Sequence, residues 1–172
     1  HESENEPASL HNSACSVVVP QAKILSALSS QQRHYLNNTV SVHGLKTLNF
    51  KSVLDAEIAS GQQNSFSDLD SDVINLVSML FEFILDDRQL QAPMKALLAR
   101  LQIPILKVAI IDGSFFDRGG HPARKLLNEI ASAAIGWNEK PEGQTDRLKD
   151  KIEGLVETIL RDFDDNIELF TV

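Results

Sequence analysis

The feature that most constrains this chain is a nearly continuous apolar run from Val73 to Leu85, in which 10 of 13 residues are apolar. It follows three acids that suit the positive N-terminal end of a helix: Asp68, Asp70 and Asp72. Its polar residues are spaced three and four apart and form one thin stripe on an apolar cylinder: Asn75, Ser78 and Glu82. We therefore predict a helix over Ser67 to Leu85 that is either the central helix of a multihelical domain, which we favour, or an oligomer face.

Proline, glycine and apolar spacing predict the other helices. We expect them from Pro20, over 50–59, from Pro93 to about Leu101, over 105–111, from His121 to Gly136, and from the N-cap Thr145 onward. Their expected buried faces include Ile24, Leu25 and Leu28; Val53, Leu54 and Ile58; Met94, Leu97, Leu98 and Leu101; Leu126, Leu127, Ile130 and Ala134; and Leu148, Ile152, Leu155, Val156, Ile159 and Phe163. The run 105–111 suits a buried strand or a buried helix, and we assign it as a helix because no convincing partner strand exists.

The remaining segments are predicted loops, and residues 1–16 are a predicted disordered tail or linker. Residues 17–172 then form a single all-α domain, a multihelical bundle or short irregular helical array of about six or seven helices. Apolar residues continue to Val172, so we expect the chain to be a fragment of a longer protein.

Charge is unevenly distributed along a chain whose formal net charge is -8. Residues 88–125 carry seven bases and only two acids, whereas the flanking segments are acidic. A net negative charge disfavours general binding to nucleic acid or to anionic membranes. We expect the basic centre to pair mainly with the acidic flanks, and a bound anion or acidic partner is the alternative.

One turn within this basic centre is the candidate binding site. It comprises Arg118, Gly119, Gly120, His121, Arg124 and Lys125. Glycines before a helix N-terminus expose N–H groups that bind anions, and bases in the first helical turn oppose the helix dipole unless a negative group is near. We expect Arg124 to pair with the carboxylate of Asp112 or Asp117, and His121 to act as an N-cap or a packed turn residue; a phosphate-bearing ligand is the alternative partner.

Catalytic and metal-binding motifs are poorly represented. Cys15 lies in the predicted tail, no serine lies in a G-x-S-x-G turn, and the five histidines are scattered. Asp112, Asp117 and His121 are too loosely spaced to predict a metal site. The sequence therefore predicts no catalytic residue, no metal and no cofactor.

The block Leu80 to Trp137 resembles an uncharacterised bacterial domain family of large proteins, some of which carry a thymidine phosphorylase label. The resembling pieces are FILDD (83–87), LQIP (101–104) and HPARKLL (121–127). This resemblance implies a cytoplasmic, largely helical region of a multidomain protein, with no catalytic residues to transfer. The phosphorylase label has no support in the sequence, which lacks a glycine-rich phosphate loop after a strand.

These observations favour a non-enzymatic interaction or regulatory scaffold domain that binds other proteins or copies of itself. The alternative is a sensor domain that holds a phosphorylated small molecule, such as a nucleotide or cyclic dinucleotide, at residues 118–125.

Overall fold

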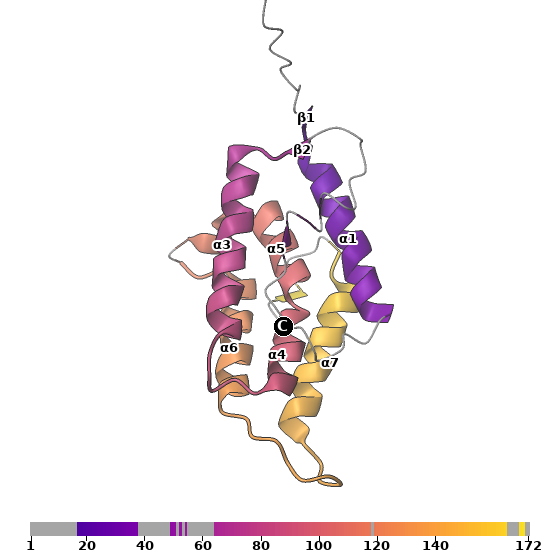
Figure 1. The fold of residues 1–172 in the computed structure, drawn as a ribbon, viewed down its shortest axis with the longest axis vertical. Coiled ribbons are helices and arrows are strands. Elements are labelled where there is room, and N and C mark those ends of the chain that lie inside the picture. Colours follow the sequence, from indigo (N-terminus) through magenta and orange to yellow (C-terminus); the bar gives the residue numbers. More distant parts are fainter. Residues whose placement is uncertain are drawn as a thin grey trace, which may run out of the picture.

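The computed structural model describes residues 17–37, 49–50, 52, 54, 64–117, 119–164 and 169–170. Six α-helices and one 3-10 helix have both ends within these residues, and the all-α prediction is confirmed. They are α1 (Gln21–Asn37), α3 (Asp68–Leu85), α4 (Ala92–Ala99), α5 (Gln102–Ile111), η1 (Gly113–Phe116), α6 (Pro122–Ile135) and α7 (Arg147–Asp162). Figure 1 shows α3 and α1 on opposite sides of α5, with α7 beside α1.

A minimal parallel sheet accompanies the helices. The two-residue strands β1 (Val17–Val18) and β2 (Asn64–Ser65) pair Val17 with Asn64 and Val18 with Ser65. This pairing brings together the segments that precede α1 and α3 (Figure 1). The sequence analysis found no convincing strand, because pairs this short leave no apolar alternation to detect.

Several predictions fall wholly or partly outside the described residues. They are the tail 1–16, most of the predicted loop 36–47, most of the helix 50–59, and the first half of the predicted loop 60–67, whose described half contains β2. Within the expected helix 50–59, Phe50, Ser52 and Leu54 are helical, and Phe50 and Leu54 are buried.

The central helix is α5. Every residue from Gln102 to Ile110 is buried, and the helix packs against α1, α3 and η1. The helix predicted over 105–111 begins earlier than expected, because α4 ends at Ala99 and α5 begins at Gln102. Pro104 lies in the first turn of α5, where its missing N–H would have no partner within the helix.

The helix α3 forms where predicted, but it is not the central helix. Ser67 caps it, because the Asp70 N–H donates to Ser67 Oγ at 3.1 Å. Only one side packs inward, through Ile74, Val77, Phe81, Ile84 and Leu85. The opposite side of the helix is exposed, so the favoured interpretation of the run 73–85 was wrong.

Two details of α7 also differ from expectation. Asp146, not Thr145, is the N-cap of α7, because its Oδ1 accepts from Lys149 N–H at 3.1 Å. Its other carboxylate oxygen accepts the Trp137 indole N–H, which joins the end of α6 to the start of α7. Leu148 and Leu155, predicted on the buried stripe of α7, are exposed.

Candidate functional site

The predicted site turn is organised around Asp112 and His121. Asp112 Oδ1 accepts from the Ser114 N–H at 2.9 Å and from the Ser114 hydroxyl at 2.7 Å, which caps η1. Its Oδ2 lies 3.0 Å from His121 Nε2. The hydroxyl and N–H of Ser114 lower the pKa of Asp112, burial opposes this, and His121 adds to the lowering.

His121 is buried and has partners on both ring nitrogens. Its Nδ1 accepts the N–H of Ala123 at 3.1 Å, so His121 is the N-cap of α6. A nitrogen that accepts carries no proton, which places the ring proton on Nε2, where it is donated to Asp112. The ring also packs on Phe115, with centroids 5.5 Å apart.

Ser114, Asp112 and His121 are the residue types of a catalytic triad, but they are connected differently. A triad needs a histidine nitrogen that accepts the serine proton. Here Ser114 donates to Asp112, and the accepting nitrogen of His121 is occupied by Ala123 N–H. The arrangement therefore lacks the free histidine nitrogen of a triad, and its hydrogen bonds hold the turn together.

The predicted anion-binding residues are only partly brought together. Gly120 has a φ of +77°, and the Lys125 side chain folds back over it. Arg124 Nη2 donates to the main-chain carbonyl of Asp117 at 2.7 Å, whereas we expected a carboxylate partner. Gly119 is exposed, and Arg118 lies outside the described residues.

The start of α6 has few main-chain donors for an anion. Pro122 has no N–H, and the N–H of Ala123 is bound to His121. The main-chain N–H groups of these first two helical positions are the ones that would otherwise donate to a phosphate at a helix N-terminus. In the described part of the chain, no group of three or more His, Cys, Asp or Glu residues is placed to hold a metal ion.

A buried polar cluster lies where α1, α5 and the end of α7 meet, and the sequence analysis did not identify it. Gln32 Nε2 donates to the carbonyls of Leu160 and Phe163, both at 2.8 Å, and lies 3.5 Å from that of Ile159. Lys107 Nζ donates to Gln32 Oε1 at 3.3 Å. Gln32 thereby satisfies the carbonyls of Leu160 and Phe163 at the C-terminal end of α7, where a helix leaves carbonyls without an intrahelical donor.

Lys107 is 1% exposed and places its charge at the negative end of α7. Its ammonium lies 5.0 Å from the centroid of the Phe163 ring and 3.8 Å from an Asp164 oxygen. Asp164 belongs to the acidic C-terminal segment, so this contact joins the basic centre to an acidic flank. The single charge within the apolar run 105–111 was the signal that could have marked this position.

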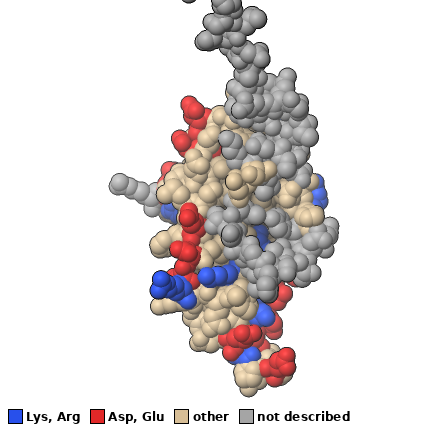
Figure 2. Space-filling view, viewed as in Figure 1, with Lys and Arg blue, Asp and Glu red and all other residues tan. Residues whose placement is uncertain are grey.

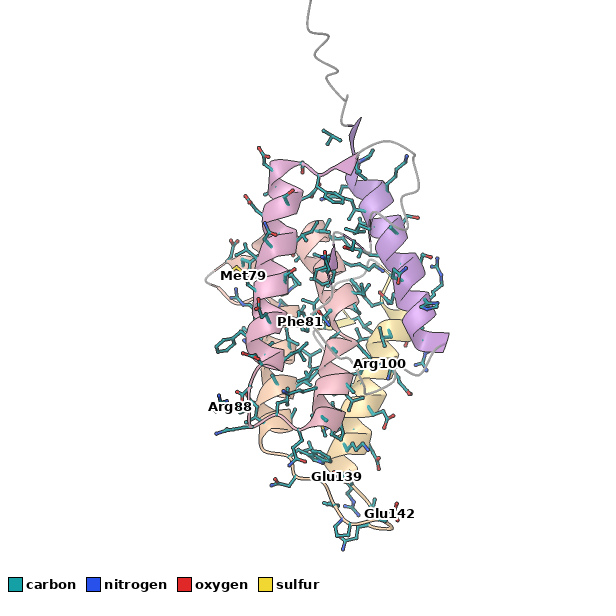
Figure 3. The ribbon with its side chains drawn as sticks, in the orientation of Figure 1. Met79, Phe81, Arg88, Arg100, Glu139 and Glu142 are labelled. Carbon is teal, nitrogen blue, oxygen red and sulfur yellow. The ribbon has the colours of Figure 1, made fainter. Side chains whose placement is uncertain are left out.

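The most prominent exposed feature of the described residues is the outer side of α3. Four large apolar side chains there are exposed: Leu69 by 72%, Leu76 by 44%, Met79 by 64% and Phe83 by 81%. Figure 3 labels Met79 and the buried Phe81 on this helix. Val73 and Leu80, which are partly buried, lie between the exposed residues along the helix.

The spacing of these residues is that of a heptad. Intervals of four and three residues separate Leu69, Val73, Leu76, Leu80 and Phe83, which we call the outer seam. The inward residues 70, 74, 77, 81 and 84 repeat the same spacing, shifted by one position. One helix thus carries two seams of the kind that pack against other helices, and only one of them faces the core.

Acidic side chains follow one edge of the outer seam. Asp68, Asp72, Glu82 and Asp86 are exposed, and residues 68–87 contain no Lys or Arg. Figure 2 shows acidic groups along the side of the molecule where α3 lies, with basic groups near the lower end of that side. At the C-terminal end of the helix, Phe83 lines a shallow open hollow together with Glu82, Asp86 and Asp87.

Comparison with known proteins identifies the family. The model of the second domain of a family described as "Protein of unknown function (DUF1631)" matches residues 18–166. The chain belongs to this family. The match extends beyond the block 80–137 in both directions, and it includes α1, α3 and α7. No curated protein and no solved structure matches the chain.

None of the helices in the described residues has the length and hydropathy needed to cross a membrane.

Proposed function

We propose that this domain is a protein-interaction module that docks a helix on the outer seam of α3. The observation that supports the proposal is the exposure of Leu69, Leu76, Met79 and Phe83 on one side of a single helix. They are four of the seven large apolar side chains exposed in the described residues. Contiguous exposed apolar surface of this kind is typical of interaction sites, whereas isolated exposed apolar residues are ordinary.

The heptad spacing specifies the kind of partner. A helix presents residues at intervals of three and four along one line, and a second helix can pack side chains into the spaces between them. An extended peptide would need an unpaired strand edge, and the helix α3 has none. The proposed partner is therefore an amphipathic helix.

The proposal also includes the setting that the family resemblance implies. We infer that the domain works in the bacterial cytoplasm, as part of a larger protein in which it acts as a scaffold. The thymidine phosphorylase label is not part of the proposal, because both ring nitrogens of His121 are engaged, by Asp112 and by the Ala123 N–H, and neither is left to accept a proton.

Site-specific crosslinking in the full-length protein tests the docking surface. A photoreactive phenylalanine analogue replaces Met79 on the outer seam, and in a matched control it replaces the exposed Asn128 of α6. We expect the Met79 position to crosslink to one defined peptide with an amphipathic helical pattern, and this product to disappear when Leu76→Glu is added. Equal labelling from both positions, or no defined product from Met79, would refute the proposal.

A further inference from the structure

We infer that the helix docked on the outer seam carries Lys and Arg beside its apolar stripe, and that one of these bases enters the hollow at Phe83. This inference rests on the proposed function and adds the charge of the partner. It follows from three observations on α3: the absence of bases, the acids along one edge, and the aromatic ring among carboxylates.

The first observation argues against a second copy of this chain as the occupant. Residues 68–87 carry six acids and no base. Two copies of α3 packed antiparallel would bring their acidic edges together, and in either direction α3 offers no base to pair with these acids, so charge opposes association of two copies. A basic flank on the partner removes this repulsion and replaces it with attraction.

The second observation is the position of the acids relative to the seam. With 3.6 residues per turn, Asp68, Asp72, Glu82 and Asp86 all fall on the same edge, next to Met79. The other edge of the seam continues into the core through the partly buried Val73 and Leu80. A partner helix lying on the seam would therefore face these acids with one of its flanks.

The third observation concerns the hollow at the C-terminal end of α3. The Phe83 ring is exposed and lies among Glu82, Asp86 and Asp87. Carboxylates near a helix C-terminus oppose the helix dipole, so a cation is favoured there for two reasons. An ammonium or guanidinium is also attracted to the face of an aromatic ring. The chemistry of this hollow therefore fits a Lys or Arg side chain.

Two designed peptides test the inference against the 172-residue chain. Each is an amphipathic helix of about three heptads with Leu at its seam positions. One carries Lys beside the seam and the other carries Glu. Fluorescence anisotropy of labelled peptide measures the dissociation constants at low and at moderate salt.

We expect the Lys peptide to bind about tenfold or more tightly than the Glu peptide, and the difference to shrink as salt rises. Combining Glu82→Gln with Asp86→Asn should weaken the Lys peptide by about threefold or more. The matched control combines Glu139→Gln with Glu142→Gln in the exposed loop before α7, which Figure 3 labels, and should change binding less than about twofold.

The outcomes separate this inference from the docking proposal. Leu76→Gln should weaken the binding of both peptides. If neither peptide binds, or if Leu76→Gln leaves their binding unchanged, the seam is not a docking surface, and both the docking proposal and the basic partner are refuted. If both peptides bind equally well and Leu76→Gln weakens both, docking stands and the basic partner is refuted. If sedimentation equilibrium shows a dimer that Leu76→Gln dissociates, a second copy is the occupant and the inference is overturned.

Discussion

Gln32 should be one of the most sensitive polar positions of this domain, and Gln32→Met measures its contribution. Methionine has nearly the same length and shape, so the substitution removes hydrogen bonds without opening a large cavity. It leaves the carbonyls of Leu160 and Phe163 without their side-chain donor, and Lys107 without the Gln32 oxygen. All of these groups are buried where α1, α5 and the end of α7 meet.

The magnitude follows from the bonds that are lost. Two hydrogen bonds between neutral groups contribute about 1 kcal/mol each, and one from an ammonium contributes about 1.5 to 3 kcal/mol. Lys107 can shift toward the exposed Asp164, which offsets part of the loss. We therefore expect Gln32→Met to lower the free energy of unfolding by about 2 to 4 kcal/mol.

A matched control lies on the same helix. Gln21 Nε2 makes one partly buried hydrogen bond, to the Ile110 carbonyl at 3.1 Å. Gln21→Met should therefore cost only about 0.5 to 1.5 kcal/mol. Urea unfolding measures both variants, with unchanged slopes as the check that only stability has changed. If Gln32→Met costs no more than Gln21→Met, the reasoning about the buried cluster is refuted.

Three further predictions concern the turn before α6, and each is measured by chemical denaturation without ligand. Arg124→Ala should cost at most about 1 kcal/mol, because its partner is an exposed carbonyl and its charge opposes the helix dipole; a loss above about 2 kcal/mol would indicate a carboxylate partner instead. His121→Ala should cost about 1 to 3 kcal/mol, and His121→Asn should recover part of this by capping α6; equal losses would refute the capping role. The folded state lowers the pKa of Asp112, so its stabilisation is full above about pH 4 and declines as pH falls through the lower folded value. Asp112→Asn should reduce this acid dependence, and an unchanged pH profile would contradict the assignment.

Local signals in the sequence were sufficient to place most helices. Proline at a helix start, an acidic first turn and a closing glycine act within a few residues, so they can be identified without knowing the fold. Pro122 begins α6 and Asp68 begins α3, each one residue after the predicted start. Thr145 and Asp146 are both good N-caps, and Asp146, which caps α7, also accepts the indole N–H of the distant Trp137, a bond that the local sequence does not reveal.

Contacts between distant segments were not predictable in the same way. The bonds from Gln32 to the end of α7 span 128 and 131 residues of sequence. Arg124 was expected to find a carboxylate, because the residue pattern gives the nearby charges but not the path of the main chain. The path through Asp117 brings a carbonyl within reach instead.

The sequence predicted α3 as the central helix, but α5 occupies that position. This difference shows what an apolar pattern specifies. Both segments are rich in apolar residues, and both were assigned as helices, yet the longer run lies at the surface and the shorter one is buried on every side. Hydrophobic content gives the area that favours burial, but it does not say whether this chain or another protein covers it. A helix with a single apolar stripe needs one neighbour, whereas the two seams of α3 need two, and the described residues provide only the inner one. The apolar content that suggested a central helix is therefore divided between a seam that packs on the core and a seam that is exposed in the described residues, and the proposed docked helix would cover the second.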